Sequence, residues 1–110
     1  MLEDDPYAEI CVRALRACHD ICLRAATVDR LMISGLPVPA NHIRSMLDCA
    51  EICQVAANFL VRDSDNYVRI CYEAAVICRE LASMSEKFDN NMNVVAACNA
   101  CASACDDLKI

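Results

Sequence analysis

The stretch ACHDICLRAA at residues 17–26 is nearly repeated as DCAEICQVAA at residues 48–57. Each copy places two cysteines four residues apart and continues, three residues after the second cysteine, into a pair of alanines. Residues four apart lie on the same face of an α-helix. Each copy therefore predicts a helix that presents two thiols side by side, and the repeat predicts two antiparallel helices whose thiols lie at matching heights.

The composition extends this helical prediction to the whole chain. The 110 residues include one glycine, no tryptophan and 5% aromatic residues, whereas β-sandwiches and barrels need aromatic and β-branched strands and glycine-rich turns. Alanine, leucine, glutamate, arginine and methionine are abundant here and are strong helix formers. We expect one all-α domain over residues 1–110, large enough for a simple core.

Proline, glycine and capping residues divide the chain into four predicted helices. Asp5 followed by Pro6 is typical of a helix start, and the stretch SGLPVPAN at residues 34–41 interrupts helical structure. The helices are expected from about Pro6 to Leu31, from Ala40 to Arg62, from an N-cap at Ser64 to Glu86, and from Asn91 to Leu108. Their short connections predict an antiparallel up-down-up-down four-helix bundle.

All ten cysteines follow the periodicity of these helices. Within each helix they are spaced by three, four or seven residues, so they share one face, and in a bundle that face points to the axis. Folding the helices back on one another places the thiols in three predicted layers. The layers are Cys22, Cys49, Cys78 and Cys98; then Cys18, Cys53 and Cys101; then Cys11, Cys71 and Cys105.

The core positions next to this column of thiols are small. They include Ala14, Ala57, Ala74, Ala75 and Ala82. A core chosen for packing alone would use leucine and isoleucine, which fill far more volume. Buried cysteine is also common as a small apolar residue, but the number of thiols and the space beside them predict a bound metal.

Copper in the Cu(I) state suits this pattern best. Thiolates are soft ligands that suit Cu(I), zinc and iron–sulfur clusters. Zinc sites usually draw on C-x-x-C pairs, and only Cys98 and Cys101 have that spacing here. Iron–sulfur clusters usually take closely spaced cysteines of a loop, whereas CNACASAC at residues 98–105 lies among helix formers. A zinc protein, an iron–sulfur or redox protein and a ligand-free structural bundle stay open as alternatives.

Further soft side chains gather at one end of the predicted bundle. His42 and Met46 continue the stripe of Cys49 and Cys53 outward, at steps of four, three and four residues. We expect this end to be the metal entrance, because thioether and imidazole are weaker ligands for Cu(I) than thiolate. Three more methionines, which could equally plug the bundle end as flexible core residues, are Met32, Met84 and Met92.

The remaining histidine and the other end of the bundle are expected to play no part in metal exchange. His19 lies off the cysteine stripe and is predicted to be a surface residue. The opposite end should be closed by apolar side chains, which would leave the metal a single route. These side chains are Tyr7, Phe59, Leu60, Tyr67 and Leu108.

Charge and patterning exclude several classes of function. The net charge of −6 and the absence of a run of lysine or arginine argue against nucleic-acid binding, and no apolar stretch is long enough to span a membrane. The acidic start MLEDDPYAEIC does not resemble a signal peptide, so we expect a cytoplasmic protein with reduced thiols. An enzyme is not expected, because cysteine catalysis needs a nearby base and His42 has no carboxylate on its stripe.

Four stretches carry a resemblance to a known family. They are ACHDICLRAA, MLDCAEICQVAANFLVRDS, VRICYEAAVICRELA and CNACASAC. Together they resemble the cysteine-rich four-helix-bundle family of copper storage proteins. The resemblance implies a bundle that packs Cu(I) on thiolates along its axis, a homo-oligomer that is often a tetramer, and, in the absence of a signal peptide, a cytosolic member.

The chain departs from the family in having fewer cysteines than its well-loaded members. Ala57, Ala75 and Ala82 stand where a longer column of thiols could continue. If each copper takes two thiolates and each thiolate can bridge two coppers, ten cysteines predict between ~5 and ~10 Cu(I) ions per chain.

Overall fold

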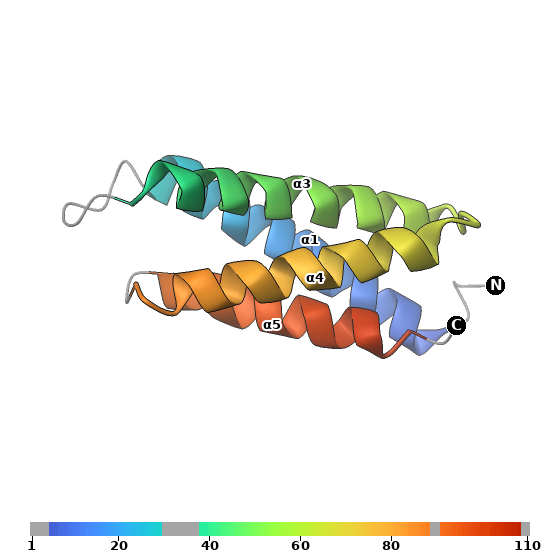
Figure 1. Cartoon of the computed structure of the whole chain (residues 1–110). Helices are drawn as coiled ribbons and strands as arrows, with labels where there is room; N and C mark the ends of the chain where they lie inside the picture. The colour runs from blue at the N-terminus through green and yellow to red at the C-terminus, as the bar shows by residue number, and fades with distance from the viewer. Residues whose placement is uncertain (1–4, 30–37, 89–90, 109–110) are drawn as a thin grey trace.

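The computed structural model describes residues 5–29, 38–88 and 91–108. Within these ranges the chain is helical, with no strand: α1 (Pro6–Arg24), the π-helical turn η2 (Ala25–Asp29), α3 (Ala40–Val61), α4 (Tyr67–Ser85) and α5 (Met92–Asp106). The four α-helices lie side by side and run alternately up and down (Figure 1). They form a rod of 47 × 19 × 19 Å. The predicted all-α four-helix bundle is confirmed.

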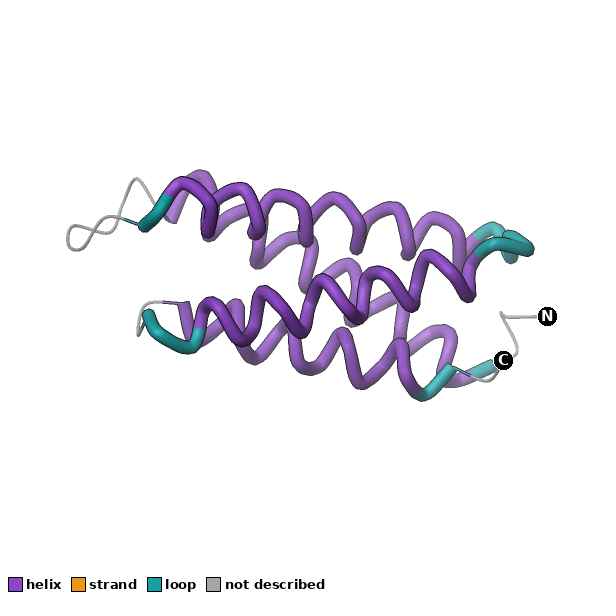
Figure 2. Tube along the Cα trace, in the orientation of Figure 1, coloured by secondary structure: helices purple, strands orange, loops and turns teal. Residues whose placement is uncertain are grey.

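Each helix packs against two neighbours. Helix α1 contacts α3 and α5, and α4 contacts the same two, so the four helices surround one central axis (Figures 1 and 2). The residues that face this axis are mostly cysteine and alanine. The bulkiest fully buried side chains are Leu15, His42, Met46, Leu81 and Val94. Small side chains therefore line most of the axis, as the sequence predicts.

The first helix begins where the sequence places it. The backbone N–H of Tyr7 donates to the Asp5 carboxylate at 2.9 Å, which makes Asp5 the N-cap. Regular α-helix ends at Arg24 and widens into the π-helical turn η2, where the Thr27 hydroxyl donates to the Leu23 carbonyl at 2.7 Å. The predicted end at Leu31 lies outside the described residues.

The connection between α3 and α4 differs from the prediction in detail. Ser64 does not cap α4, because the helix begins later, at Tyr67. Instead the Ser64 hydroxyl accepts the N–H of Asn66 at 3.1 Å and stabilises the turn before the helix. Asp63 has a positive φ of 53°, a conformation that aspartate tolerates better than most residues. This tight turn sets the height of α4 relative to α3.

Candidate metal centre

All ten cysteines lie in the core as free thiols. Their exposed fractions range from 0% to 9%. Because every cysteine follows the buried stripe of its helix, the four helices bring their sulfurs together along one axis. The result is a column of thiols that extends from Cys22 and Cys98 at the end near His42 to Cys11 and Cys71 at the opposite end.

Two groups of four thiols form the upper part of the column. In each group, all four sulfur atoms lie within 4.8 Å of one another. The first group is Cys18, Cys22, Cys49 and Cys98, and the second is Cys18, Cys49, Cys53 and Cys78. Cys18 and Cys49 belong to both groups, so the two are fused into one cluster of six thiols.

The predicted layering of this part is wrong for Cys78. Its sulfur lies 3.6 Å from that of Cys49 and 3.7 Å from that of Cys53, between the two expected layers. Cys18 lies 3.8 Å from Cys98 of the layer above and is also grouped with Cys53 of its own predicted layer. Antiparallel helices are staggered along their axis by the geometry of their turns, so the thiols form a continuous column and not separate tiers.

The lower part is a group of three thiols, Cys11, Cys71 and Cys105, as predicted. The sulfurs of Cys11 and Cys105 are 3.6 Å apart. Cys101 connects this lower cluster to the upper one, because its sulfur lies 3.9 Å from that of Cys53 and it precedes Cys105 by one helical turn. All ten thiols therefore belong to one connected set.

The spacing of the sulfurs suits metal binding. Four sulfurs at about 2.3 Å from a shared ion are about 3.8 Å apart in a tetrahedron, and three are about 4.0 Å apart in a plane. The closest sulfur pairs of the column are 3.6–4.0 Å apart. These distances match the spacing of sulfurs that share one ion.

Hydrogen bonding within the lower cluster shifts the pKa values of its thiols in opposite directions. Contacts with Cys101, Cys11 and Cys71 lower the pKa of Cys105. The hydrogen bond with Cys105 raises the pKa of Cys71 to about 12, and contacts with Cys105 and Cys71, together with burial, raise the pKa of Cys11. A metal ion that binds here must displace the protons of the thiols, which makes its affinity depend on pH.

His42 lies at the end of the column where the sequence predicts an entrance. The side chain is 1% exposed, and Met46, one turn further along α3, is fully buried. The His42 ring stacks on Phe88 with a centroid distance of 5.0 Å, and its Nε2 lies 2.8 Å from the Ser85 hydroxyl. Burial lowers the pKa of His42, so the imidazole is neutral at neutral pH.

This arrangement leaves one nitrogen of His42 available to a ligand. The buried Nδ1 has no hydrogen-bond partner among the described residues. When Nε2–H donates to Ser85, Nδ1 keeps its lone pair, which is the form of imidazole that binds metals. Sequence reasoning missed Ser85, although it follows Cys71 and Cys78 at steps of seven residues on the same stripe of α4.

The other predicted entrance residues are methionines, and those that the structure describes are less buried than His42 and Met46. Met84 is half-buried near the end of α4. Met92, the first residue of α5, is 53% exposed. Met32 lies outside the described residues. His42 and Met46 are therefore buried on the same stripe of α3 as Cys49 and Cys53, whereas Met92 lies at the surface of the protein.

The comparisons with known proteins agree with this geometry. A family model described as copper storage protein matches residues 4–109. The chain belongs to the copper storage protein family. It is also similar to the crystal structure of the Nmul_A1745 protein from Nitrosospira multiformis, with a TM-score of 0.86 and 36% sequence identity over 92% of this chain and 93% of that chain. Among curated proteins, none matches.

Two features of this member of the copper storage family differ from the sequence-based expectations. The first is His19, which is half-buried and not a surface residue. Its Nδ1 lies 2.7 Å from the carbonyl oxygen of Ala50, so His19 ties α1 to α3. A residue off the core stripe can still be covered by the neighbouring helix, because the bundle buries the flanks of each helix as well as its inner face.

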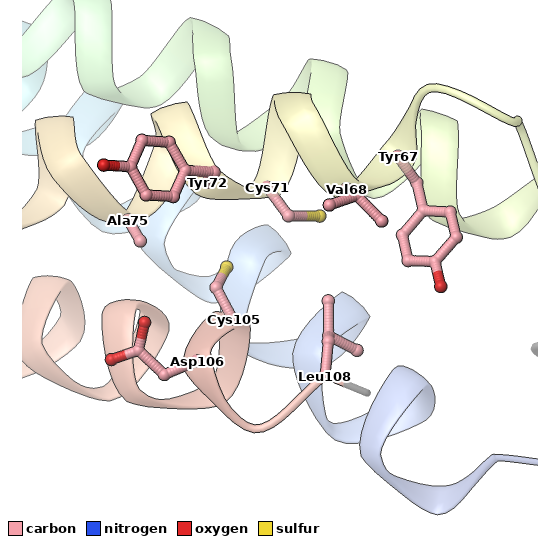
Figure 3. Close-up of a pocket in the computed structure, with 8 residues that line it drawn as sticks. All are labelled: Tyr67, Val68, Cys71, Tyr72, Ala75, Cys105, Asp106 and Leu108. Carbon is pink, nitrogen blue, oxygen red and sulfur yellow. The ribbon is translucent and has the colours of Figure 1, made fainter. Parts of the chain in front are cut away.

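The second difference is at the end opposite His42, where a pocket remains beside the expected apolar side chains. Leu60 and Leu108 are buried there as predicted, and Tyr67 is half-buried, but Tyr7 is 45% exposed. Between α4 and α5 a pocket of 140 Å³ remains, and two cysteines, Cys71 and Cys105, are in its wall (Figure 3). Apolar residues alone therefore do not seal this end of the column.

No helix in the described part of the chain is long and apolar enough to cross a lipid bilayer.

Proposed function

We propose that this protein binds several Cu(I) ions on the thiolates of its axial column and stores or buffers them without catalysing a reaction. The observation that carries the proposal is the fusion of two four-thiol groups through Cys18 and Cys49, in a chain of the copper storage protein family. Thiolates shared between neighbouring groups favour a cluster of soft ions with bridging ligands. We propose all ten cysteines as copper ligands, with ~5 to ~10 ions per chain.

We further propose that copper enters beside His42 and Met46, with Met32, Met84 and Met92 as outer ligands. The free Nδ1 of His42 supports this assignment, as does the burial of Met46 on the same stripe as Cys49 and Cys53. An ion would then pass from thioether and imidazole to thiolate, from weaker to stronger ligands. We also propose that the protein is cytoplasmic and forms a homo-oligomer, as the resemblance implies.

Zinc is the second candidate, and one observation favours it. The group of Cys18, Cys49, Cys53 and Cys78 has nearly the spacing of a tetrahedral zinc site. A closed zinc site, however, uses its four ligands for one ion, and here two of the four are shared with the next group. Zinc would therefore fill far fewer sites than Cu(I), which accepts low coordination numbers.

Competition with a chelator tests the proposal. The fully reduced protein is titrated anaerobically with Cu(I) in the presence of a tight chromophoric Cu(I) chelator, and several equivalents are expected to be withheld from the chelator. A variant with Cys18, Cys22, Cys49 and Cys53 replaced by serine should withhold far fewer. The matched control introduces serine at the exposed alanines Ala17, Ala96 and Ala100 and should behave like the wild type. A chelator that takes every ion from the wild type would refute copper storage.

A further inference from the structure

The pocket beside the lower cluster lies far from the proposed entrance. Cys71, in its wall, precedes Ser85 on α4 by fourteen residues, which corresponds to about 21 Å along the helix. The opening is formed by α4 and by the end of α5, near Tyr67 and Leu108 (Figure 3). It therefore gives access to the thiol column at the end opposite His42.

Two of the three thiols of the lower cluster face this pocket. The sulfurs of Cys71 and Cys105 project into the space between α4 and α5 (Figure 3). Cys105 is 9% exposed, more than any other cysteine of the chain. An ion bound by the lower cluster would lie about 2.3 Å from each sulfur, and hence close to the floor of the pocket.

The lower cluster also differs from the upper one in its number of ligands. It has three thiols, whereas each upper group has four. Three thiolates complete a planar Cu(I) site, so an incoming thiol binds by replacing one of them, whereas a tetrahedral ion would keep its fourth position open. The pocket lies on the side of the cluster where such a ligand could approach.

The size and charge of the pocket define which ligand fits. Its volume of 140 Å³ is close to that of a cavity that holds benzene, about 150 Å³. It can admit the end of a small aliphatic thiol. The carboxylate of Asp106 at the rim of the pocket is paired with Arg79. Because the arginine balances the negative charge of the carboxylate, a thiol that carries its own negative charge is not repelled there.

We propose that this pocket is a second exchange route, through which low-molecular-weight thiols take Cu(I) from the lower cluster or deliver it there. The inference rests on the proposed copper storage function. In each step of the exchange, the sulfur of an incoming thiol binds Cu(I) as the bond between Cu(I) and one thiolate of the cluster breaks, first that of Cys105 and then those of Cys71 and Cys11. The proton of each incoming thiol passes to the thiolate that it replaces, and copper remains in the +1 state, so no oxidant or reductant is needed.

Alkylation of the metal-free protein tests the route independently of copper. The protein is treated with iodoacetamide, and the labelling rates of Cys105 and Cys18 are measured by mass spectrometry. The rates are compared between the wild type and two variants. Ala75→Leu fills the pocket, whereas Ala100→Leu adds the same side chain at an exposed position of the bundle. We expect Ala75→Leu to slow labelling of Cys105 by about tenfold or more, because only local opening would then expose this thiol. Ala100→Leu should leave the rate unchanged.

Comparing the same thiol between variants removes differences in intrinsic reactivity. An unchanged Cys105 rate in Ala75→Leu would overturn the proposal. If the helical circular dichroism of Ala75→Leu shows that it is not folded, Val68→Phe fills the pocket from another position of its wall, and the same outcomes apply to it.

A second arm uses the copper-loaded protein. Release of Cu(I) to free cysteine should be several-fold slower in Val68→Phe, which fills the pocket from a position outside the thiol column, than in the wild type or Ala100→Leu, while the copper count is the same in all three. Equal release rates at equal counts overturn the exchange route and leave copper storage intact. A wild type that holds no copper overturns the proposed function, and with it the exchange, whatever the alkylation shows.

Discussion

Replacing Ser85 by alanine removes the hydrogen-bond partner of the buried His42 ring. In the wild type Nε2 is paired with the Ser85 hydroxyl at 2.8 Å, while Nδ1 already lacks a partner among the described residues. Ser85→Ala leaves both ring nitrogens unpaired inside the protein. A buried polar group without a partner costs about 1–3 kcal/mol, so we expect the metal-free variant to lose about that much free energy of unfolding.

Urea denaturation of the metal-free protein measures this loss. The matched control is Ser83→Ala, which removes an exposed hydroxyl from the same helix and should change the free energy of unfolding by less than about 0.5 kcal/mol. A double-mutant cycle with His42→Leu isolates the pair. When His42 is already absent, Ser85→Ala should cost little, because the serine no longer has an imidazole to satisfy.

The cycle also contains the result that would refute the reasoning. If Ser85→Ala costs as much in the His42→Leu background as in the wild type, the loss comes from packing around Ser85 and not from its hydrogen bond with His42. In that case Ser85 could not be said to set which nitrogen of His42 is free.

Three further predictions follow from the same structure. Burial lowers the pKa of His42 below its ordinary value of 6.5, so the unfolded chain binds this proton more tightly than the folded protein does. The free energy of unfolding should therefore be retained above pH 6.5 and should decrease as the pH falls from there toward the folded-state pKa. Urea midpoints measured at a series of pH values should depend less on pH in His42→Leu than in the wild type. Cys18→Ser should lower the Cu(I) count by more than Cys22→Ser, because Cys18 belongs to two four-thiol groups and Cys22 to one; chelator competition and native mass spectrometry give the counts, and equal losses would argue against shared ligands. Cu(I) at about 100 times its dissociation constant should stabilise the folded protein by about 2.7 kcal/mol per independent site, which calorimetry would record as a higher melting temperature; a melt indifferent to copper would support a ligand-free bundle.

Most of the fold could be predicted from local sequence. Asp5 and Pro6 mark the start of α1 correctly, and the predicted bounds of α3 differ from the observed Ala40–Val61 by one residue. The error at Ser64, which stabilises the turn and does not cap α4, is of the usual size for a helix boundary. Such signals are local, because capping and helix breaking involve residues only a few positions apart.

Part of the candidate site could be predicted as well. The lower cluster of Cys11, Cys71 and Cys105 is grouped as expected, whereas Cys18 and Cys78 lie between the two predicted upper layers. The assignment of the thiols as copper ligands stays a prediction. Counting residues from each turn gives the height of a cysteine only to about one helical turn, because the count takes no account of turn geometry or helix stagger.

The sequence by itself determined that ten cysteines share the buried stripes of four helices, because a period of 3.6 residues fixes the direction of every side chain around its own helix. Tertiary structure alone decided which thiols lie within reach of one another, that Ser85 holds one nitrogen of His42, that His19 is covered by α3, and that a pocket opens beside Cys105. These features depend on the stagger of one helix against the next and on contacts between residues far apart in the chain. Helical periodicity contains no information about either.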